Sequence, residues 1–230
     1  FNVSSERIDK GLLFNYSLNV ANTNSLTFGA EIKLGSVNGG DYYTTSPDTV
    51  LNRGIQRFFA SYLQYKFGLM KNRLRVVSSM RMDDVKFYDG YFSTNVENNP
   101  LYNYNGKMAE SNWKALSPRI ALRYYLENNI SLYSSFSRGF RAATLDDLCR
   151  TGWMRLGPKL ANPELGPETI DSYEIGLDYS PHHSLRISPT IYYSKGKGFM
   201  YYVATGELLW GKRPIYTREN VTAVDIRGAE

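Results

Sequence analysis

The chain has 230 residues, a net charge of +5 and a high content of 19 Tyr and 11 Phe against only 3 Trp. Lys and Arg are spread along the chain without a run of like charges, which argues against nucleic-acid binding. The single cysteine, Cys149, excludes a disulfide within the chain and a cluster of cysteine metal ligands. No stretch approaches the roughly 18 consecutive apolar residues of a transmembrane helix.

Strands with a two-residue period are the predicted elements. In chain order they cover 12–20, 25–37, 55–67, 73–88, 116–126, 130–141, 171–180, 185–203 and 217–230. Within 116–126, Ile120 and Leu122 fall on one face, and Arg119 and Arg123 on the other. Two arginines on one face suit a wall with lipid outside and a wet interior. The sequence therefore predicts an all-β fold, an antiparallel up-and-down transmembrane β-barrel without helices longer than about two turns, of which this chain holds about nine strands.

The predicted connections alternate between short and long. The short ones are polar turns at 21–24, 68–72, 127–129 and 181–184. The long ones cover roughly 38–54, 89–115, 142–170 and 204–216. Outer-membrane barrels combine short periplasmic turns with longer extracellular loops, so we expect the long connections to be extracellular.

Several segments also stand in the order of a known family. They are SPRIALRYYLENNISLYSSFSRGFRAATLDDL, NPELGPETIDSYEIGLDY, LRISPTIYYSKGKGFMYYV and NVTAVDIRGAE, with LTFGAEIKL and Arg81-Met82-Asp83 upstream. Together they resemble the barrel of TonB-dependent outer-membrane receptors, the energised transporters of Gram-negative bacteria. The resemblance covers roughly residues 12–230.

This resemblance implies that residues 1–230 are part of one receptor β-barrel domain of about 22 strands with a plugged lumen. We expect the plug domain, with its TonB-contact segment, and the closing strands to be absent from this chain. An open sheet of nine strands in lipid would have two unpaired edges, so we expect this chain to be part of a larger receptor. The implied location is the Gram-negative cell outer membrane. The implied partners are outer-membrane lipid, TonB through the absent plug, and a small-molecule ligand such as a ferric siderophore.

The implied function is active uptake of a scarce nutrient. An iron-siderophore complex leads, with cobalamin, haem and glycans behind. Haem receptors of this family carry a histidine between their Phe-Arg-Ala and Asn-Pro boxes, and none lies between Phe140-Arg141-Ala142 and Asn162-Pro163 here. The resemblance calls for no cofactor.

Two alternatives remain open from the sequence. One is an outer-membrane barrel enzyme of the protease or phospholipase type, which needs a catalytic histidine near the extracellular rim. The two histidines, His182 and His183, instead lie in a predicted periplasmic turn. The other is a soluble β-sheet ligand-binding module, which the interior arginines and lipid-type faces disfavour. We expect neither catalytic residues nor a metal site.

Candidate ligand-binding residues come from the predicted outer loops and rim. Arg141 falls on the inward face near the rim, and aromatic side chains suit ligand capture because few torsions must be ordered. The candidates are Arg141, Arg150, Trp153, Arg155, Tyr102, Tyr104 and Trp113. The alternatives are solvation of the rim arginine and packing of the long loops against each other.

Charged residues provide two further expectations. Arg81 and Asp83 share one face of a strand; the resemblance implies that they face the lumen and contact the plug, and the alternative is an ion pair with a neighbouring strand. The acidic residues of 142–170 have oxygen atoms that calcium prefers, but lack EF-hand spacing, so solvation is the simpler interpretation. They are Asp146, Asp147, Glu164 and Glu168.

Overall fold

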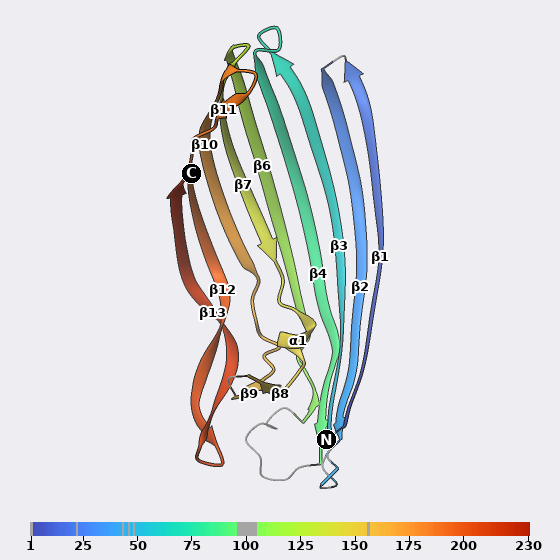
Figure 1. Ribbon diagram of the computed structural model, residues 1–230. Helices are drawn as coiled ribbons and strands as arrows, with labels where there is room; N and C mark the ends of the chain where they lie inside the picture. Colours follow the sequence, from blue (N-terminus) through green and yellow to red (C-terminus); the bar gives the residue numbers. More distant parts are fainter. Residues whose placement is uncertain are drawn as a thin grey trace.

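The computed structural model describes residues 2–21, 23–42, 44, 45, 47, 49–95, 105–155 and 157–230. Within these residues, nine long strands pair in chain order, each antiparallel to the next (Figure 1). They are β1 (Asn2–Ala21), β2 (Asn24–Tyr42), β3 (Thr49–Leu69), β4 (Leu74–Thr94), β6 (Ser111–Glu127), β7 (Ile130–Arg141), β10 (Glu168–His182), β12 (Thr190–Leu209) and β13 (Arg213–Ala229). The predicted meander of about nine strands is confirmed.

Four short strands and one helix accompany these nine in the described part of the chain. The strands are β5 (Gly106–Lys107), β8 (Gly152–Met154), β9 (Gly157–Leu160) and β11 (Leu185–Ile187), and the helix is α1 (Leu145–Leu148). β9 pairs in parallel with β13, which adds β9 and β8 beyond β13 in the sheet. Among the described residues, no helix is long and apolar enough to cross a membrane.

The two faces of the sheet differ as the alternation predicts. Large apolar side chains are exposed on one face, including Leu63 (51%), Ile175 (59%) and Ile191 (63%). Charged side chains on the other face are shielded by their partners, so that the carboxylates of Asp83 and Asp178 are each only 11% exposed. An apolar outer surface and a polar inner surface are the properties of a barrel wall in lipid.

The strands extend further than the alternation predicts at the end with the long connections. The expected excursion at 204–216 is wrong: β12 and β13 are joined by a tight turn in which Trp210 (φ 52°) and Gly211 (φ 65°) adopt positive φ. The excursion at 38–54 is shorter than expected, because the Gly39-Gly40 segment pairs with Asn52 and Leu51. Backbone pairing does not require the alternation that marks the lipid-facing part of a strand.

Two other boundaries differ from the prediction. The expected strand at 185–203 is split, with β11 ending at Ile187 and β12 beginning at Thr190. Pro189 lies in the break, and proline has no N–H to donate to a ladder. β1 begins at Asn2 instead of near residue 12, although residues 2–11 are strongly polar, because they pair residue by residue with β2.

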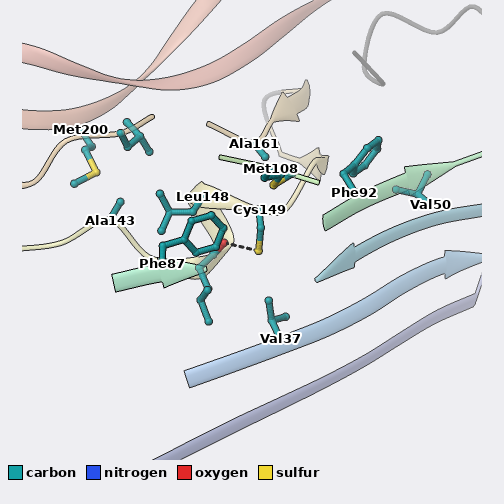
Figure 2. Packing of buried hydrophobic residues seen from close by; sticks show 12 residues of the cluster. Val37, Val50, Phe87, Phe92, Met108, Ala143, Leu148, Cys149, Ala161 and Met200 are labelled. Atoms are coloured by element: carbon teal, nitrogen blue, oxygen red, sulfur yellow. Dashed lines mark hydrogen bonds between the residues drawn. The ribbon is translucent and has the colours of Figure 1, made fainter. Parts of the chain in front are cut away.

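The buried core lies at the end of the sheet with the long connections. It joins residues of β2, β3 and β4 to the segment 142–167, which contains α1, β8 and β9 (Figures 1 and 2). Its members are Val37, Val50, Phe87, Phe92, Met108, Ala143, Leu145, Leu148, Cys149, Ala161, Leu165 and Met200. The segment connecting β7 to β10 is therefore packed against the inner face of the sheet.

Candidate functional site

Residues 142–167, hereafter the crossbar, connect the neighbouring strands β7 and β10 but reach strands well beyond both. On one side, Gln56 Nε2 of β3 donates to Ala143 O at 2.9 Å, and Asn52 Oδ1 accepts from Thr151 N at 3.1 Å. Gln56 and Asn52 are both buried. These bonds satisfy backbone groups of the crossbar that are removed from water.

Apolar packing strengthens the same anchorage (Figure 2). Leu148 and Cys149 are fully buried in the cluster with Phe87 of β4. Gly54 of β3 makes the close approach feasible, since a Cβ atom there would lie 2.8 Å from Cys149 Sγ. A glycine at this position is thus needed for space rather than for a special backbone conformation.

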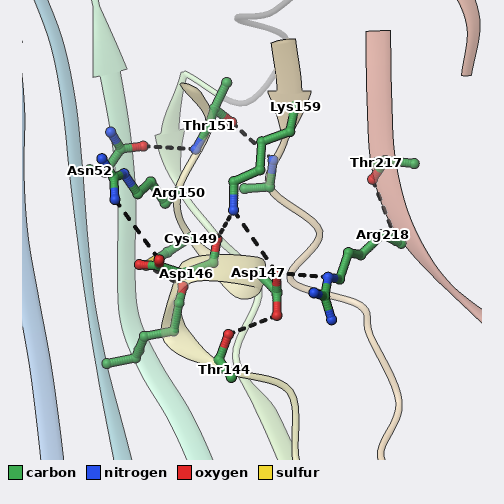
Figure 3. A network of polar contacts seen from close by, with 12 residues as sticks. Asn52, Thr144, Asp146, Asp147, Cys149, Arg150, Thr151, Lys159, Thr217 and Arg218 are labelled. Carbon is green, nitrogen blue, oxygen red and sulfur yellow. Dashed lines mark hydrogen bonds and ion pairs between the residues drawn. The ribbon is translucent and has the colours of Figure 1, made fainter. Parts of the chain in front are cut away.

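On the opposite side, the crossbar is anchored to β13 by charged groups around Asp147 (Figure 3). Asp147 Oδ2 accepts a hydrogen bond from Thr144 Oγ1 at 2.7 Å. Its Oδ1 lies 3.1 Å from Arg218 Nε and 3.9 Å from Lys159 Nζ. The Asp147 side chain is only 6% exposed. The expectation of a solvated acid is therefore wrong for Asp147, which forms the centre of a buried ion cluster.

Neutral contacts continue this second anchorage. Asn162 Nδ2 donates to Arg218 O at 2.9 Å, and Asn220 of β13 exchanges hydrogen bonds with both backbone groups of Gly166, at 2.8 and 3.0 Å. Leu160 of β9 also packs against Leu209 and Ile215, two buried residues of the β12–β13 hairpin. The crossbar is therefore tied to β3 on one side and β13 on the other, with five long strands of the sheet between them.

A pocket of about 570 Å³ lies between the crossbar and the inner face of β1–β4. Its lining brings Arg141 together with Arg81 and Asp83, a pair that the sequence singled out separately from Arg141. Lys33 and Phe58 line it as well. The pocket thus combines cationic groups with apolar surface, which suits a ligand with both characters.

Ion pairs hold the charged groups of this pocket in place. Arg81 Nε donates to both carboxylate oxygens of Asp83, at 2.9 and 3.1 Å, and its Nη2 lies 3.0 Å from Glu31 Oε2 of β2. The structure thus contains the ion pair within the barrel wall, and contact of Arg81 and Asp83 with a plug stays a prediction. Arg141 Nε donates to Glu168 Oε2 at 2.5 Å. Glu168 is buried, so solvation is a wrong expectation for this residue as well.

Three other candidate residues, Arg150, Trp113 and Arg155, are not in the described lining of this pocket. Arg150 approaches Asp146 at 3.9 Å, and half-buried Trp113 packs against the apolar cluster. Arg155 is exposed just after β8. Trp153 lies in β8, but its side chain is outside the description, and Tyr102 and Tyr104 lie outside the described residues. A ligand-binding role for these residues stays a prediction.

A second charged site, near the short turns, was missed by the sequence analysis. Asp178 of β10 lies 2.8 Å from Arg123 Nη1 and 2.6 Å from Arg186 Nη2, and it accepts a hydrogen bond from Ser188 Oγ at 2.7 Å. Alternation in the sequence indicates only that Asp178 and Arg186 lie on the polar faces of their strands. Ser188, the third member of the site, lies in the break between β11 and β12, which alternation does not reveal.

Cysteine and histidine chemistry is absent from the pocket lining that the structure describes. Burial raises the pKa of the Cys149 thiol to about 12, and its Sγ donates to Leu145 O at 3.1 Å. His182 and His183 lie at the far end of β10, at the short turns. Among the described residues, no group of three or more His, Cys, Asp or Glu residues is arranged to hold a metal ion.

Comparison with solved structures finds the same fold at low sequence identity. The chain resembles the copper transporter OprC (TM-score 0.74, 13% identity). It also resembles a double mutant of the Serratia marcescens hemophore receptor HasR in complex with its hemophore HasA and heme (0.69, 12%), and the ferric yersiniabactin uptake receptor FyuA from Yersinia pestis (0.64, 14%). Each match covers 99% of this chain but only 35%, 39% and 32% of those chains, respectively. At these identities the likeness shows the fold alone.

Sequence comparison identifies the family. The search of curated proteins gives no match. Residues 2–230 match the family model described as "TonB dependent receptor-like, beta-barrel", which covers nearly the whole chain. This family implies the outer membrane of Gram-negative bacteria. The chain therefore belongs to the TonB-dependent receptor family, as part of its β-barrel.

Proposed function

We propose that this chain is part of the barrel wall of an outer-membrane active transporter that imports a ferric siderophore with energy delivered through TonB. The proposal assigns residues 1–230 to one barrel domain whose plug and closing strands lie outside this chain. It also assigns the end with the crossbar to the cell exterior, since short turns are periplasmic in outer-membrane barrels. Its function is transport, without a chemical reaction.

The pocket beneath the crossbar is the observation that carries the proposal. Its volume of about 570 Å³ falls within the range of small-molecule sites. Guanidinium groups form strong hydrogen bonds to anionic oxygens, the groups by which a ferric chelate is recognised. Arg81 and Arg141 therefore provide the polar contacts, and Phe58 and Leu145 the apolar ones.

The chemistry of the site favours a ferric siderophore over haem and copper, the ligands named for two of the structural relatives. Haem uptake is disfavoured because no histidine lies between the Phe-Arg-Ala and Asn-Pro boxes. Copper binds soft sulfur and imidazole ligands, and no Cys, Met or His is among the described residues that line the pocket. Cobalamin and glycans remain as weaker candidates.

Equilibrium binding to the intact purified protein tests the ligand class. The panel contains ferric catecholate, hydroxamate and phenolate siderophores, haem, cyanocobalamin, a maltooligosaccharide and Cu²⁺. We expect one ferric siderophore class to bind with a Kd of about 1 μM or below. Arg141→Gln should weaken this binding about tenfold, because it removes a charge-assisted contact.

Arg138→Gln is the matched control, since Arg138 lies three residues away on the opposite face and pairs with Asp171 outside the pocket. Its binding should equal that of the wild type. Binding of haem or Cu²⁺ without any ferric siderophore would contradict the proposed ligand. Equal losses in the two variants would contradict the assignment of the pocket.

A further inference from the structure

The crossbar is attached differently at its two sides. Toward β3 it is held by apolar packing and two hydrogen bonds to backbone groups, from Gln56 and to Asn52. Toward β13 the side-chain charges converge on one buried carboxylate, that of Asp147. Removal of one partner from a buried ion pair leaves the other charge uncompensated and is strongly unfavourable. Asp147 is therefore the centre of the charged part of this second attachment, beside the neutral contacts of Asn162, Asn220 and Leu160.

The crossbar also forms one wall of the lumen pocket. Ala142, Ala143, Thr144 and Leu145 line it opposite Lys33 and Arg81. Thr144 is at the same time a hydrogen-bond donor to Asp147. The position of this pocket wall is thus coupled to the ion cluster through Thr144, which also accepts a hydrogen bond from the backbone N of Asp147 at 3.0 Å.

From these contacts we propose that Asp147 is a positioning residue that holds residues 142–167 as a fixed bar across the barrel interior, and that this bar keeps the ligand pocket preformed. The identity of the ligand rests on the proposed function, whereas the fixed position of the crossbar does not. Arg218 is the partner of Asp147 on the barrel wall, at 3.1 Å, and its guanidinium also lies 4.6 Å from the ring centre of Tyr202. A preformed site binds more tightly because less ordering is needed when the ligand arrives.

Cys149 provides a reporter of the bar that is independent of the ligand. Its side chain is fully buried between the bar and Gly54, and it is the only cysteine among these 230 residues. A fixed bar protects the thiol, whereas local opening exposes it to reagent. The reaction of Cys149 with a membrane-impermeant maleimide, followed by mass spectrometry of its peptide in the intact protein, measures this opening.

The test compares Asp147→Ala with Asp146→Ala. Asp146 is the adjacent residue on α1, with a side chain 44% exposed against 6% for Asp147. We expect Asp147→Ala to speed the labelling of Cys149 by about tenfold or more, the factor for an opening equilibrium shifted by about 1.4 kcal/mol. Asp146→Ala should stay within about twofold of the wild type.

Ligand binding is the second measurement. In Asp147→Ala, the Kd for the ferric catecholate, hydroxamate or phenolate siderophore that binds the wild type should rise about tenfold, with an unchanged number of sites per assembled receptor. Arg218→Met tests the same pair from the wall and should give the same two changes. The double variant should be no worse than either single variant, because the two residues act through one contact.

The possible results distinguish the proposal about the crossbar from the proposal about the ligand. The proposal would be overturned if Cys149 in the wild-type protein were labelled as fast as in the denatured protein. It would also be overturned if both Asp147→Ala and Arg218→Met showed the same labelling rate and binding as the wild type. If no siderophore binds the wild type, the proposed function fails and the labelling still decides whether the bar is fixed. If Asp147→Ala and Arg218→Met do not assemble, Gly54→Val provides the test. Its added methyl groups occupy the place of Cys149 Sγ. Faster labelling of Cys149 then supports a crossbar packed on β3, and unchanged labelling overturns the proposal.

Discussion

Glu31, Ala60 and Asp83 form one cross-strand row on the inner face of β2, β3 and β4. The small side chain of Ala60 lets Arg81 reach Glu31 across the intervening strand while it also pairs with Asp83. An arginine with two carboxylate partners is held in one orientation, because its planar fork matches carboxylate oxygens. The residues of the pocket are thus positioned by pairing within the wall before any ligand is present.

The lipid-facing and lumen-facing residues of β6 allow a direct comparison. Leu122 is outward and lies five positions from Glu127, where β6 ends at a short turn. About 9–11 strand residues span a bilayer, so this is near the midplane. We expect Leu122→Arg to destabilise the inserted barrel by about 2–4 kcal/mol, measured by reversible unfolding in lipid vesicles.

Arg119→Leu is the control on the inner face of the same strand and should cost less than about 1 kcal/mol. It is a sharper control than Arg123→Leu, because Arg123 pairs with Asp178. Equal destabilisation by Leu122→Arg and Arg119→Leu would show that the two faces of β6 have been assigned wrongly.

At the scale of elements, the crossbar is not a peripheral loop, because it is buried in part and pairs with the sheet. Residues 150–160 include the buried Thr151 and Pro158, and the β9 pairing with β13. Their deletion should abolish ferric-siderophore binding to the intact protein. Assembly should survive, because β7 and β10 remain paired from Arg141–Glu168 to Ile130–Tyr179.

Heat-modifiable migration in gels measures assembly, and equilibrium binding measures the ligand. A deletion protein that assembles and binds the siderophore with wild-type affinity would exclude the crossbar from the site. Failure to assemble would instead show that the crossbar is required to form the wall itself.

The strands were predictable from the sequence because apolar and polar residues alternate within each strand, and this local pattern reflects the two environments of its faces. The crossbar was not, because its contacts join distant positions: Gln56 with Ala143, 87 residues apart, and Asn52 with Thr151, 99 apart. Asp147 was recognised only as an acidic loop residue. No local pattern distinguishes a solvated carboxylate from one that meets Arg218, 71 positions later, on another strand.

At the scale of the whole molecule, β1 forms one end of the sheet path, and in the part of the chain that the structure describes β13 pairs beyond β12 only over the short β9. Backbone groups without partners cost several kcal/mol each in lipid, so the proposal pairs both edges with further strands of the same receptor. This agrees with the chain covering only 32–39% of the three solved structures. The sequence indicated the partial barrel through its strand number, whereas the curvature that brings the crossbar against both β3 and β13 required the structure.

Uptake of ⁵⁵Fe-loaded siderophore by whole cells tests the central claim most directly. The intact protein is produced in a Gram-negative host without siderophore receptors of its own, in otherwise identical strains with and without TonB, and its amount in the outer membrane is matched. The account predicts that cells accumulate ⁵⁵Fe from the siderophore that binds the purified protein, and that accumulation falls to the level of receptor-free cells when TonB is missing. Equal accumulation with and without TonB, or none from any ferric siderophore of the panel, would contradict it.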